Sequence, residues 1–330
     1  MIRWPAEWEN QSAVLFSFPR AEGDWGSQLK AASKEIAHLI AAASRFVKVL
    51  VLAGDADWAS NYKELLTRAT LVEIPTNDCW IRDYGPIGIY SSEQLKWLDF
   101  RFNAWGQKYA FYHDNLVNAR LWAKDELGPH HMISLDWVLE GGSIETDGQG
   151  TILTTTSCLL NDNRNPGLIK EEIEELLKQK LGGDRVVWLD HGHLIGDDTD
   201  GHIDTLVRFC SPNTIAYVSC EDPGDAHYLK LKKVEQQLRE SFPKHQLVPL
   251  PLPPPIYDAE DGHRLPATYA NFLITNGAVL LPTYGLPSDQ IAVSVLEKVF
   301  PNRELIPLSS RAIIHQHGSF HCLSMQLPAF

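Results

Sequence analysis

Five polar segments, spread along the whole chain, carry the side chains that could do chemistry. They read NDCWIRDYGP, LEGGSIETDGQG, DDTDGHIDT, RLPATYANF and HGSFHCLSM, and each precedes or joins a run of residues typical of a β-strand. Together they offer carboxylates at Asp83, Glu140 and Asp204, the imidazole of His202 and the thiol of Cys322. A thiol alone is mostly protonated at neutral pH, and a histidine alone only carries protons. Brought together, these two groups supply a nucleophile with a general acid and base.

The three carboxylates indicate what such a site would bind. Burying several carboxylates costs free energy unless a cation or hydrogen-bond donors neutralise them. Guanidinium fits, because it is planar, positively charged and presents parallel N–H pairs to carboxylate oxygens. The composition agrees, since 29 Lys+Arg against 42 Asp+Glu give a net charge of −13. Such a charge attracts cations and disfavours nucleic acid as a partner. We therefore expect a small cationic guanidino substrate.

These groups permit a covalent reaction that requires neither a metal nor an organic cofactor. The thiolate of Cys322 attacks the central carbon of the guanidinium, His202 protonates a leaving nitrogen, and ammonia departs. A covalent thiouronium remains on the sulfur. His202 then takes a proton from water, the hydroxyl adds to the same carbon, and a ureido product leaves with the thiol restored.

Helical and strand-like segments alternate along the chain and must position these groups. Apolar residues at three- and four-residue steps predict helices near Gln28–Arg45, Asn61–Arg68, Asp114–Leu127, Leu168–Leu181, Ala226–Ser241 and Asp289–Val299. Short β-branched runs predict strands at Val47–Leu52, Ile87–Tyr90, Thr151–Thr155, Thr214–Val218 and Ala278–Leu281. The sequence thus indicates an α/β protein.

The polar segments recur at a loose period near 60 residues. With Asp83, Glu140, His202, Asn271 and Cys322 as markers, the separations are 57, 62, 69 and 51 residues. Repetition on this scale is typical of one supersecondary unit used several times, and five such units nearly fill the 330 residues. Ordinary α/β alternation gives a similar spacing, so both interpretations stay open on spacing alone.

The same five segments, together with WPAEWENQSAVLFSFP near the start, resemble the agmatine deiminases. That family includes bacterial proteins called peptidyl-arginine deiminases and belongs to the guanidino-modifying superfamily. The motifs occur in the same order over the whole chain. The resemblance implies a pentein fold, which is a five-bladed αβ propeller with pseudo-fivefold symmetry and an active site on its central axis. It also implies one catalytic domain spanning residues 1–330.

The resemblance assigns roles to the residues that match the family's motifs. Cys322 of the HC pair would be the nucleophile, His202 of the HxD pair the acid and base, and Glu140 of the EGG segment its partner. Asp83 and Asp204 would grip the guanidinium. No metal is implied.

Trp80 would line the substrate channel, where an indole face suits an alkyl chain with a cationic end. An ordinary core aromatic is the alternative for this tryptophan. The chain reads QHGSFHC and TDGHIDT where many agmatine deiminases carry GGGNIHC and a TNGHVDN-like run. This departure leaves the contacts to the far end of the substrate open.

The expected reaction converts agmatine to N-carbamoylputrescine and ammonia, a step toward putrescine and other polyamines. Agmatine, arginine and peptidyl arginine share the guanidinium head, so the choice depends on what meets the far end. An acidic protein favours the amine of agmatine over a carboxylate. Arginine and peptidyl arginine, which would give citrulline, are the alternatives.

Two more distant alternatives remain. A metal-dependent amidohydrolase could use the HxH pairs found among His191, His193, His202, His315, His317 and His321. A non-catalytic binding protein could share the pentein fold, although the acidic charge and the complete set of reactive groups disfavour it. Four aspartates beside the reactive residues are expected to serve turns and caps, namely Asp78, Asp197, Asp198 and Asp200.

The remaining features concern the protein's surroundings. The N-terminal residues lack the pattern of a secretory signal, and no stretch is apolar enough for a membrane span, so we expect a cytoplasmic protein with no membrane partner. The family's habit suggests a homo-oligomer. The cysteines other than Cys322 form no CxxC pair and are expected to be reduced packing residues, namely Cys79, Cys158, Cys210 and Cys220.

Overall fold

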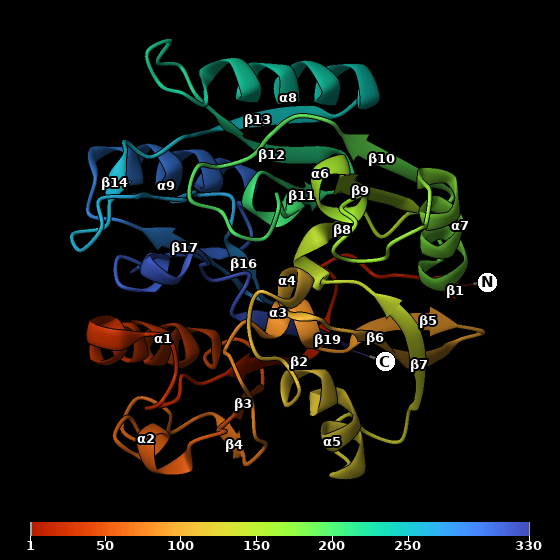
Figure 1. Cartoon of the computed structure of the whole chain (residues 1–330), viewed down its shortest axis with the longest axis vertical. Helices are drawn as coiled ribbons and strands as arrows, with labels where there is room; N and C mark the ends of the chain where they lie inside the picture. Colours follow the sequence, from red (N-terminus) through yellow and green to blue (C-terminus); the bar gives the residue numbers. More distant parts are fainter. Residues whose placement is uncertain (1, 330) are drawn as a thin grey trace.

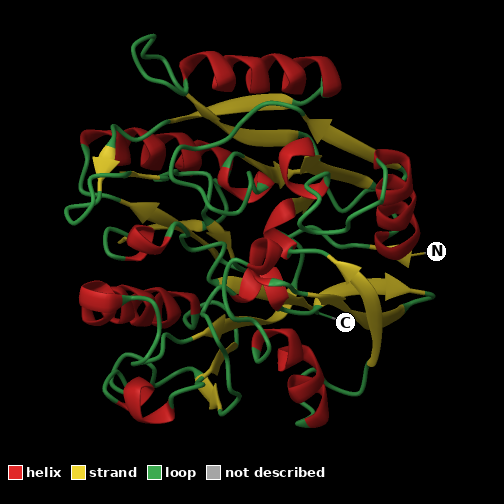
Figure 2. Cartoon of the chain, in the orientation of Figure 1, coloured by secondary structure: helices red, strands yellow, loops and turns green. Residues whose placement is uncertain are grey.

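Helices and strands alternate through residues 2–329, the part of the chain that the computed structural model describes, and form a mixed α/β fold (Figure 2). The long helices lie toward the outside of the molecule (Figure 1). They are α1 (Leu29–Ala43), α7 (Lys170–Leu181), α8 (Tyr228–Ser241) and α9 (Pro287–Val299). The short helices α3 (Ile81–Tyr84) and α4 (Ala104–Gln107) lie near the middle of the same view.

Five sheets within residues 2–329 follow one chain path. In each, two strands pair antiparallel, a helical connection follows, and the next strand pairs parallel to the second. The first sheet consists of β5 (Ile87–Ser91), β6 (Gln94–Arg101) and β7 (His131–Val138). The second consists of β8 (Ile144–Thr146), β9 (Thr151–Thr155) and β10 (Arg185–Leu189). The third consists of β11 (Val207–Ser211), β12 (Thr214–Ser219) and β13 (Gln246–Pro251). The other two are β16 (Leu273–Ile274), β17 (Ala278–Thr283) and β18 (Glu304–Ser309), and β19 (Ser324–Pro328), β2 (Gln11–Ser17) and β3 (Val49–Leu52). The loose sequence period thus corresponds to a repeated arrangement of strands.

Smaller elements complete the described chain. Strand β1 (Ile2–Arg3) adds to the edge of β5, and β4 (Thr70–Val72) adds to the edge of β3. Strands β14 (Ile256–Tyr257) and β15 (Arg264–Leu265) form a two-stranded ribbon. Short helices α2 (Ala56–Ser60), α5 (Val117–Ala123) and α6 (Thr156–Leu159) lie in the connections, as do the 3₁₀ helices η1 (Gly26–Gln28), η2 (Asp114–Leu116), η3 (Gly141–Ser143), η4 (Ile203–Thr205) and η5 (Ile313–Gln316).

The fifth sheet joins the two ends of the chain. Strand β19 pairs antiparallel with β2, and Met325 lies opposite Leu15. The strand nearest the C-terminus therefore completes a sheet whose other strands come from the first 72 residues. The residues just before β19 are fixed by this pairing.

Helix α7 illustrates why the outer helices form where they do. Ile173, Leu177 and Leu181 recur on one face and are buried, whereas Glu171, Glu172, Glu175 and Gln179 are exposed. The helix ends at Gly182, whose φ of 76° is the left-handed conformation that glycine adopts without strain. The expected helix at 168–181 is confirmed at α7.

Most other expected elements are also present, with ends that move by a few residues. Helices occur at α1, α5, α8 and α9, and strands at β3, β5, β9, β12 and β17. The helix expected at Asn61–Arg68 is wrong, because residues 61–65 form turns after α2. There Ser60 Oγ donates to Asp57 O at 2.7 Å and Asn61 Nδ2 to Trp58 O at 3.0 Å. Such side-chain bonds compete with a continuing helix.

The apolar core has two contiguous parts. One surrounds β2 and β3, where Val14, Leu15 and Phe16 are fully buried. The other underlies α8 and α9, where Leu238 and Leu296 are fully buried. Within residues 2–329, none of the helices combines the length and apolar character needed to span a bilayer.

Candidate active site

Five polar residues stand at equivalent points of the five repeated sheets. Asp83 lies in α3 just before β5, Glu140 lies just before η3 and β8, and His202 lies just before η4 and β11. Asn271 comes two residues before β16, and Cys322 comes two residues before β19. Because each residue precedes the first strand of its sheet, the repeated fold can bring widely separated segments to one place.

The imidazole of His202 lies at the centre of this group and is fully buried. Its Nδ1 is 3.6 Å from Asp83 Oδ1, and its Nε2 is 3.8 Å from Glu140 Oε2. Neither ring nitrogen has a hydrogen-bond partner. Burial lowers the pKa of His202, but the nearby carboxylates, Asp83 first, outweigh burial and hold the pKa well above its usual value. The ring is therefore poised as a proton donor.

The glycine pair after Glu140 lets the segments approach one another. A Cβ added to Gly142 would lie 2.6 Å from His202 Nδ1, 2.8 Å from Asp83 Oδ1 and 3.1 Å from Asp204 Oδ2. The place of that Cβ is therefore in contact with three of the expected site residues. Any side chain at position 142 would occupy this space. The backbone N–H of Gly142 also donates to Asp83 Oδ1 at 2.9 Å.

Glu140 is fixed by a buried arginine that sequence reasoning missed. Arg164 Nε donates to Glu140 Oε1 at 2.8 Å, and both side chains are fully buried. Arg164 also donates to Thr199 O at 2.9 Å and contacts Asp200. Burial raises the pKa of Glu140, but His202 and Arg164 outweigh it, so the pKa lies below the usual value. Glu140 stays ionised beside the imidazole.

Asp83 is held by two N–H donors. Besides Gly142, Trp105 Nε1 donates to Asp83 Oδ2 at 2.9 Å. Trp105 sits in a strained segment, with φ of 51° at Ala104, 54° at Trp105 and 65° at Gln107. Non-glycine residues rarely adopt such angles. Burial raises the pKa of Asp83 to about 6, although His202 opposes this shift.

The thiol of Cys322 lies against Asp204 and Asn271. Cys322 Sγ is 3.1 Å from Asn271 Nδ2 and 3.5 Å from Asp204 Oδ2. Asp204 Oδ2 also accepts from His321 Nδ1 at 2.7 Å, whereas Asp204 Oδ1 is buried without a partner. Burial, Asp204 and Asp83 raise the pKa of the Cys322 thiol well above its usual value. Burial also raises the pKa of Asp204, but His321 outweighs it and the net shift is downward.

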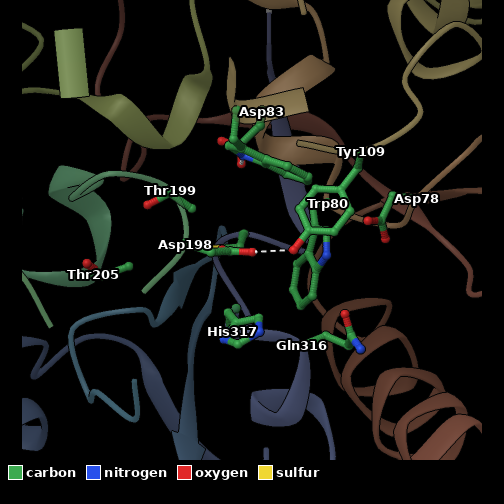
Figure 3. A pocket seen from close by; sticks show the side chains of 12 residues that line it. Asp78, Trp80, Asp83, Tyr109, Asp198, Thr199, Thr205, Gln316 and His317 are labelled. Atoms are coloured by element: carbon green, nitrogen blue, oxygen red, sulfur yellow. Dashed lines mark hydrogen bonds between the residues drawn. The ribbon is translucent and has the colours of Figure 1, made fainter. Parts of the chain in front are cut away.

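A narrow pocket leads to this group. Figure 3 shows its walls, with Asp83 at one end and His317 and Gln316 opposite. Both Asp83 and Cys322 line it, together with Asp78, Trp80, Trp105, Tyr109, Asp198, Thr199, Thr205, Gln316, His317 and Gly318. The structure therefore joins Cys322, Asp83, Asp204, His202 and Glu140 in one cluster, and the first two of them line the cavity.

Trp80 lies in the wall of this pocket and is also packed like a core residue. Its side chain is buried, and its ring centroid is 5.9 Å from that of Trp25. A Cβ added to Gly318 would lie 2.3 Å from the Trp80 ring, so only glycine leaves room for the indole there. The tryptophan is thus a fixed wall of the cavity.

Two further wall residues were missed from the sequence. Tyr109 donates its hydroxyl proton to Asp198 Oδ2 at 2.9 Å, the dashed contact in Figure 3. Asp198 was expected to serve a turn, and so was Asp78, but both face the pocket. Asp197 fulfils that expectation, since it accepts from Thr199 N at 3.0 Å and Gly201 N at 2.8 Å. The signal for Asp198 was its position in the DDTDGH run, four residues before the central histidine.

The histidine pairs do not assemble a metal centre. His193 Nδ1 faces Asp197 Oδ2 at 3.7 Å, His315 Nδ1 lies 2.7 Å from Asp258 Oδ2, and His317 Nδ1 lies 2.8 Å from Gly196 O. Among residues 2–329, the three-residue group whose ligand atoms lie within 4.8 Å of one another is Glu140, Cys158 and His202. It contains neither HxH pair.

The cysteines other than Cys322 are buried and free, as expected for packing residues. Cys158 differs from that expectation in its surroundings, because its Sγ is 4.0 Å from Glu140 Oε2. Burial raises the pKa of the Cys158 thiol above its usual value. This thiol is therefore a protonated neighbour of the reactive cluster.

The fold and the site agree with the comparison to known proteins. The sequence profile of the Porphyromonas-type peptidyl-arginine deiminase family matches residues 3–328, and the chain belongs to that family. The family expected from the motifs is confirmed.

Individual relatives make the comparison more specific. A cysteine-to-serine variant of C. jejuni agmatine deiminase, solved with substrate bound, is 39% identical, with a TM-score of 0.95 and coverage of 100% of this chain and 97% of the other. A Porphyromonas gingivalis protein provisionally named an arginine deiminase is 44% identical, with a TM-score of 0.92 and coverage of 99% of this chain and 98% of the other. The agmatine deiminase of Medicago truncatula is 34% identical over 98% of this chain and 96% of its own length.

Proposed function

We propose that this protein is an agmatine deiminase that hydrolyses agmatine to N-carbamoylputrescine and ammonia. The observation that carries the proposal is the pocket, which is lined by Cys322 and Asp83 and has further carboxylates, Asp78 and Asp198, in its walls. Asp204 Oδ2 lies 3.5 Å from the same sulfur. Agmatine carries a positive charge at each end, a guanidinium and an amine. These two charges suit carboxylates placed beside Cys322 and in the walls of the pocket. The substrate-bound agmatine deiminase among the relatives supports the same assignment.

The far end of the pocket favours an amine over a carboxylate. Neither lysine nor arginine is among the described residues that line the cavity. The carboxylate of arginine would have to lie near Asp78 and Asp198 without a cationic partner, which costs free energy in a partly buried site. The amine of agmatine meets those carboxylates with opposite charge.

Binding of the guanidinium activates the nucleophile in this proposal. In the free protein Cys322 is a thiol, because burial, Asp204 and Asp83 raise its pKa. A guanidinium held by Asp83 and Asp204 neutralises both carboxylates and adds a positive charge beside the sulfur. Both changes lower the pKa of the thiol, so the thiolate forms when substrate is present.

The chemical steps follow from the geometry around His202. The sulfur of Cys322 bonds to the guanidinium carbon to give a tetrahedral adduct, and His202 gives a proton to one nitrogen. The C–N bond then breaks, ammonia leaves, and a thiouronium remains. The neutral imidazole next takes a proton from water, and the hydroxyl adds to the same carbon. Collapse breaks the C–S bond and releases the ureido product. Glu140 orients the imidazole from its Nε2 side, 3.8 Å away.

We infer the finer architecture from the repeated sheets. Five sheets with one chain path, and the pairing of β19 with β2, support a closed five-bladed propeller that forms one domain. The active site would lie on its axis, where the residues before each first strand converge. The cytoplasmic location and the homo-oligomer stay predictions.

The decisive experiment compares three substrates under one set of conditions. Release of ammonia and of the ureido product is measured with agmatine, arginine and a capped arginine peptide. We expect kcat/KM for agmatine to exceed that for arginine and that for the peptide by at least about tenfold. A tenfold ratio corresponds to roughly 1.4 kcal/mol, which is the expected cost of one mismatched charge. A higher value for arginine, the substrate named for the P. gingivalis relative, would replace this proposal with an arginine deiminase.

A further inference from the structure

Cys158 is a buried nucleophilic group that the proposed reaction does not use. It lies in α6, between β9 and β10 of the second repeated sheet, whereas the nucleophile precedes the first strand of the fifth. Its side chain contacts the face of Glu140 that points toward His202. Three different ligand types, a thiol, an imidazole and a carboxylate, therefore meet here, and the last two belong to the reacting group itself.

The distances in this group are close to those of a metal site. Cys158 Sγ is 4.0 Å and His202 Nε2 is 3.8 Å from Glu140 Oε2, and the ligand atoms all lie within 4.8 Å of one another. A tetrahedral zinc ion with its usual bond lengths places such atoms about 3.3–3.7 Å apart. Small side-chain rotations therefore bring the three atoms to ligand separations.

The ligand atoms are also free to bind. Both ring nitrogens of His202 are buried and lack hydrogen-bond partners. Arg164 uses the other oxygen of Glu140, Oε1, at 2.8 Å, so Oε2 remains available on the side of the thiol. A metal at this point would thus give a partner to the imidazole without displacing the arginine.

The local charge favours a cation. Asp200 is already paired with Arg164 and Lys108. Once the imidazolium and the thiol have lost their protons, Glu140, Asp83 and the Cys158 thiolate stand against the single guanidinium of Arg164. Soft thiolate and imidazole ligands select zinc-like ions over magnesium or calcium. The charge and the ligand types point to the same class of ion.

We propose that Glu140, Cys158 and His202 form an inhibitory site for Zn²⁺ or Cd²⁺. The ion binds the imidazole through a ring nitrogen, which takes the lone pair that must accept a proton from water. The Nε2 proton of the imidazolium and the thiol proton of Cys158 are both released to solvent as the metal–nitrogen and metal–sulfur bonds form. The enzyme is inhibited while Cys322 remains chemically intact. The inhibition, though not the binding, rests on the proposed function.

The first test measures binding of Cd²⁺ alone and needs no substrate. It uses the Cys322→Ser protein, which removes the competing thiol of the pocket, and follows thiolate-to-cadmium charge-transfer absorbance. We expect one Cd²⁺ per chain. A second substitution, Cys158→Ser, removes the signal, whereas Cys220→Ser, which alters a buried thiol elsewhere, keeps it.

A variant that retains Cys158 guards against effects of misfolding. In the Cys322→Ser background, His202→Asn is expected to weaken Cd²⁺ binding by more than about tenfold, because loss of a direct ligand costs at least as much as loss of a supporting residue. Charge-transfer absorbance that survives Cys158→Ser, or binding that is unchanged by His202→Asn, overturns the site.

The second test measures inhibition. Zn²⁺ is titrated against the otherwise unmodified enzyme and against Cys158→Ala, each relative to its own uninhibited rate with agmatine. We expect the variant to need at least about tenfold more Zn²⁺ for half inhibition. Equal sensitivity would assign the inhibition to Cys322 and contradict the proposal. If agmatine is not turned over, the proposed function fails while the Cd²⁺ titration still decides the metal site.

Discussion

Two clusters of buried charged residues lie close together in this protein, and they differ in how completely their polar atoms are hydrogen-bonded. The reactive cluster comprises Asp83, Glu140, His202, Asp204 and Cys322. The structural cluster comprises Glu7, Glu145 and Arg208. Both are shielded from solvent, yet the hydrogen bonds of the structural cluster are complete and those of the reactive cluster are not.

Every side-chain nitrogen and oxygen of the structural cluster has a partner. Arg208 Nε donates to Glu145 Oε2 at 3.2 Å, its Nη1 donates to Phe272 O at 2.6 Å, and its Nη2 contacts Glu7 Oε2. The remaining carboxylate oxygens accept from backbone N–H groups, Ile274 N at 2.7 Å among them. Burial raises the pKa of Glu7, but Arg208 outweighs it and lowers the pKa to about 2. This cluster ties distant segments together.

The reactive cluster leaves three buried polar atoms without partners. They are both ring nitrogens of His202 and one carboxylate oxygen of Asp204. Such atoms cost free energy in a folded protein. A guanidinium brings a donor for the unpartnered oxygen of Asp204, so this oxygen marks where the substrate belongs. The comparison teaches that incomplete hydrogen bonding distinguishes the reactive group from its structural neighbour.

His321 connects the two clusters. Its Nδ1 lies 2.7 Å from Asp204 Oδ2, and its Nε2 lies 3.2 Å from Glu7 Oε2. The residue next to Cys322 is therefore anchored to the structural cluster. Substitutions in each cluster should separate stability from activity.

The largest effect is expected from Cys322→Ala. Removal of the nucleophile should reduce kcat with agmatine by at least about 10⁴-fold, the scale seen when a covalent enzyme loses its attacking group. Far-ultraviolet circular dichroism should be unchanged, and Cys220→Ala should retain activity. The unsubstituted enzyme should keep its activity after exhaustive chelation. Activity in Cys322→Ala together with loss on chelation would favour the metal-dependent alternative.

Arg208→Met should unfold the protein more easily without touching the reacting groups. It leaves Glu7 and Glu145 buried without their cation, which costs about 3–5 kcal/mol of the free energy of unfolding. Urea titration measures this loss. Arg239→Met in α8 is the control, because Arg239 pairs with Glu235 at the surface and such pairs contribute about 0–1 kcal/mol. Equal stability of the two variants would remove the distinction between the clusters.

Asp83→Asn should act in the opposite direction on stability. Burial raises the pKa of Asp83 from 3.8 to about 6, so the folded state binds the proton more tightly than the unfolded state. Stability therefore falls as the pH rises between these values, and the loss persists above them. The variant should gain about 1–3 kcal/mol at pH 7, the scale of a two-unit pKa shift, and nothing at pH 3.

The same substitution should abolish binding of the guanidinium. For the unsubstituted enzyme, kcat/KM should fall as the pH drops through about 6, because Asp83 becomes neutral there. Urea titrations and initial rates over the same pH range measure both effects. A destabilised Asp83→Asn protein at pH 7 would show that this carboxylate belongs with the structural cluster.

Asp198→Asn should produce the smallest change. It removes one charge that faces the amine of agmatine, and we expect KM to rise about tenfold with little change in kcat, the pattern of lost uniform binding. Initial rates with agmatine measure it. Asp136→Asn is the matched control, since that carboxylate is 88% exposed and pairs with Arg101 at the surface. If KM is unchanged in Asp198→Asn, the amine of agmatine does not bind near Asp198.

The sequence predicted the repeated elements and the reactive cluster for different reasons. Helices such as α7 are visible because their apolar residues recur with the helical period. The reactive residues are visible because each sits in a short polar motif before a strand. Turns after α2 escaped prediction because the side chains of Ser60 and Asn61, not the apolar pattern, end the helix there.

The supporting residues could not be predicted from motifs. Arg164 reaches Glu140 across 24 residues and Trp105 reaches Asp83 across 22, and neither spacing has a pattern of its own. The backbone around Trp105 adopts left-handed angles that composition does not reveal. Cys158 resembles any buried thiol until the fold places it beside Glu140. Tertiary packing, not local sequence, decides these contacts.

The pairing of β19 with β2 ties the position of Cys322 to a strand from the first residues of the chain. A growing polypeptide that stops before residue 324 lacks the strand that docks on β2, and with it the anchor for the sulfur two positions earlier. We therefore expect a chain cut before residue 324 to lose activity, because the segment that carries Cys322 then has no strand to dock on β2.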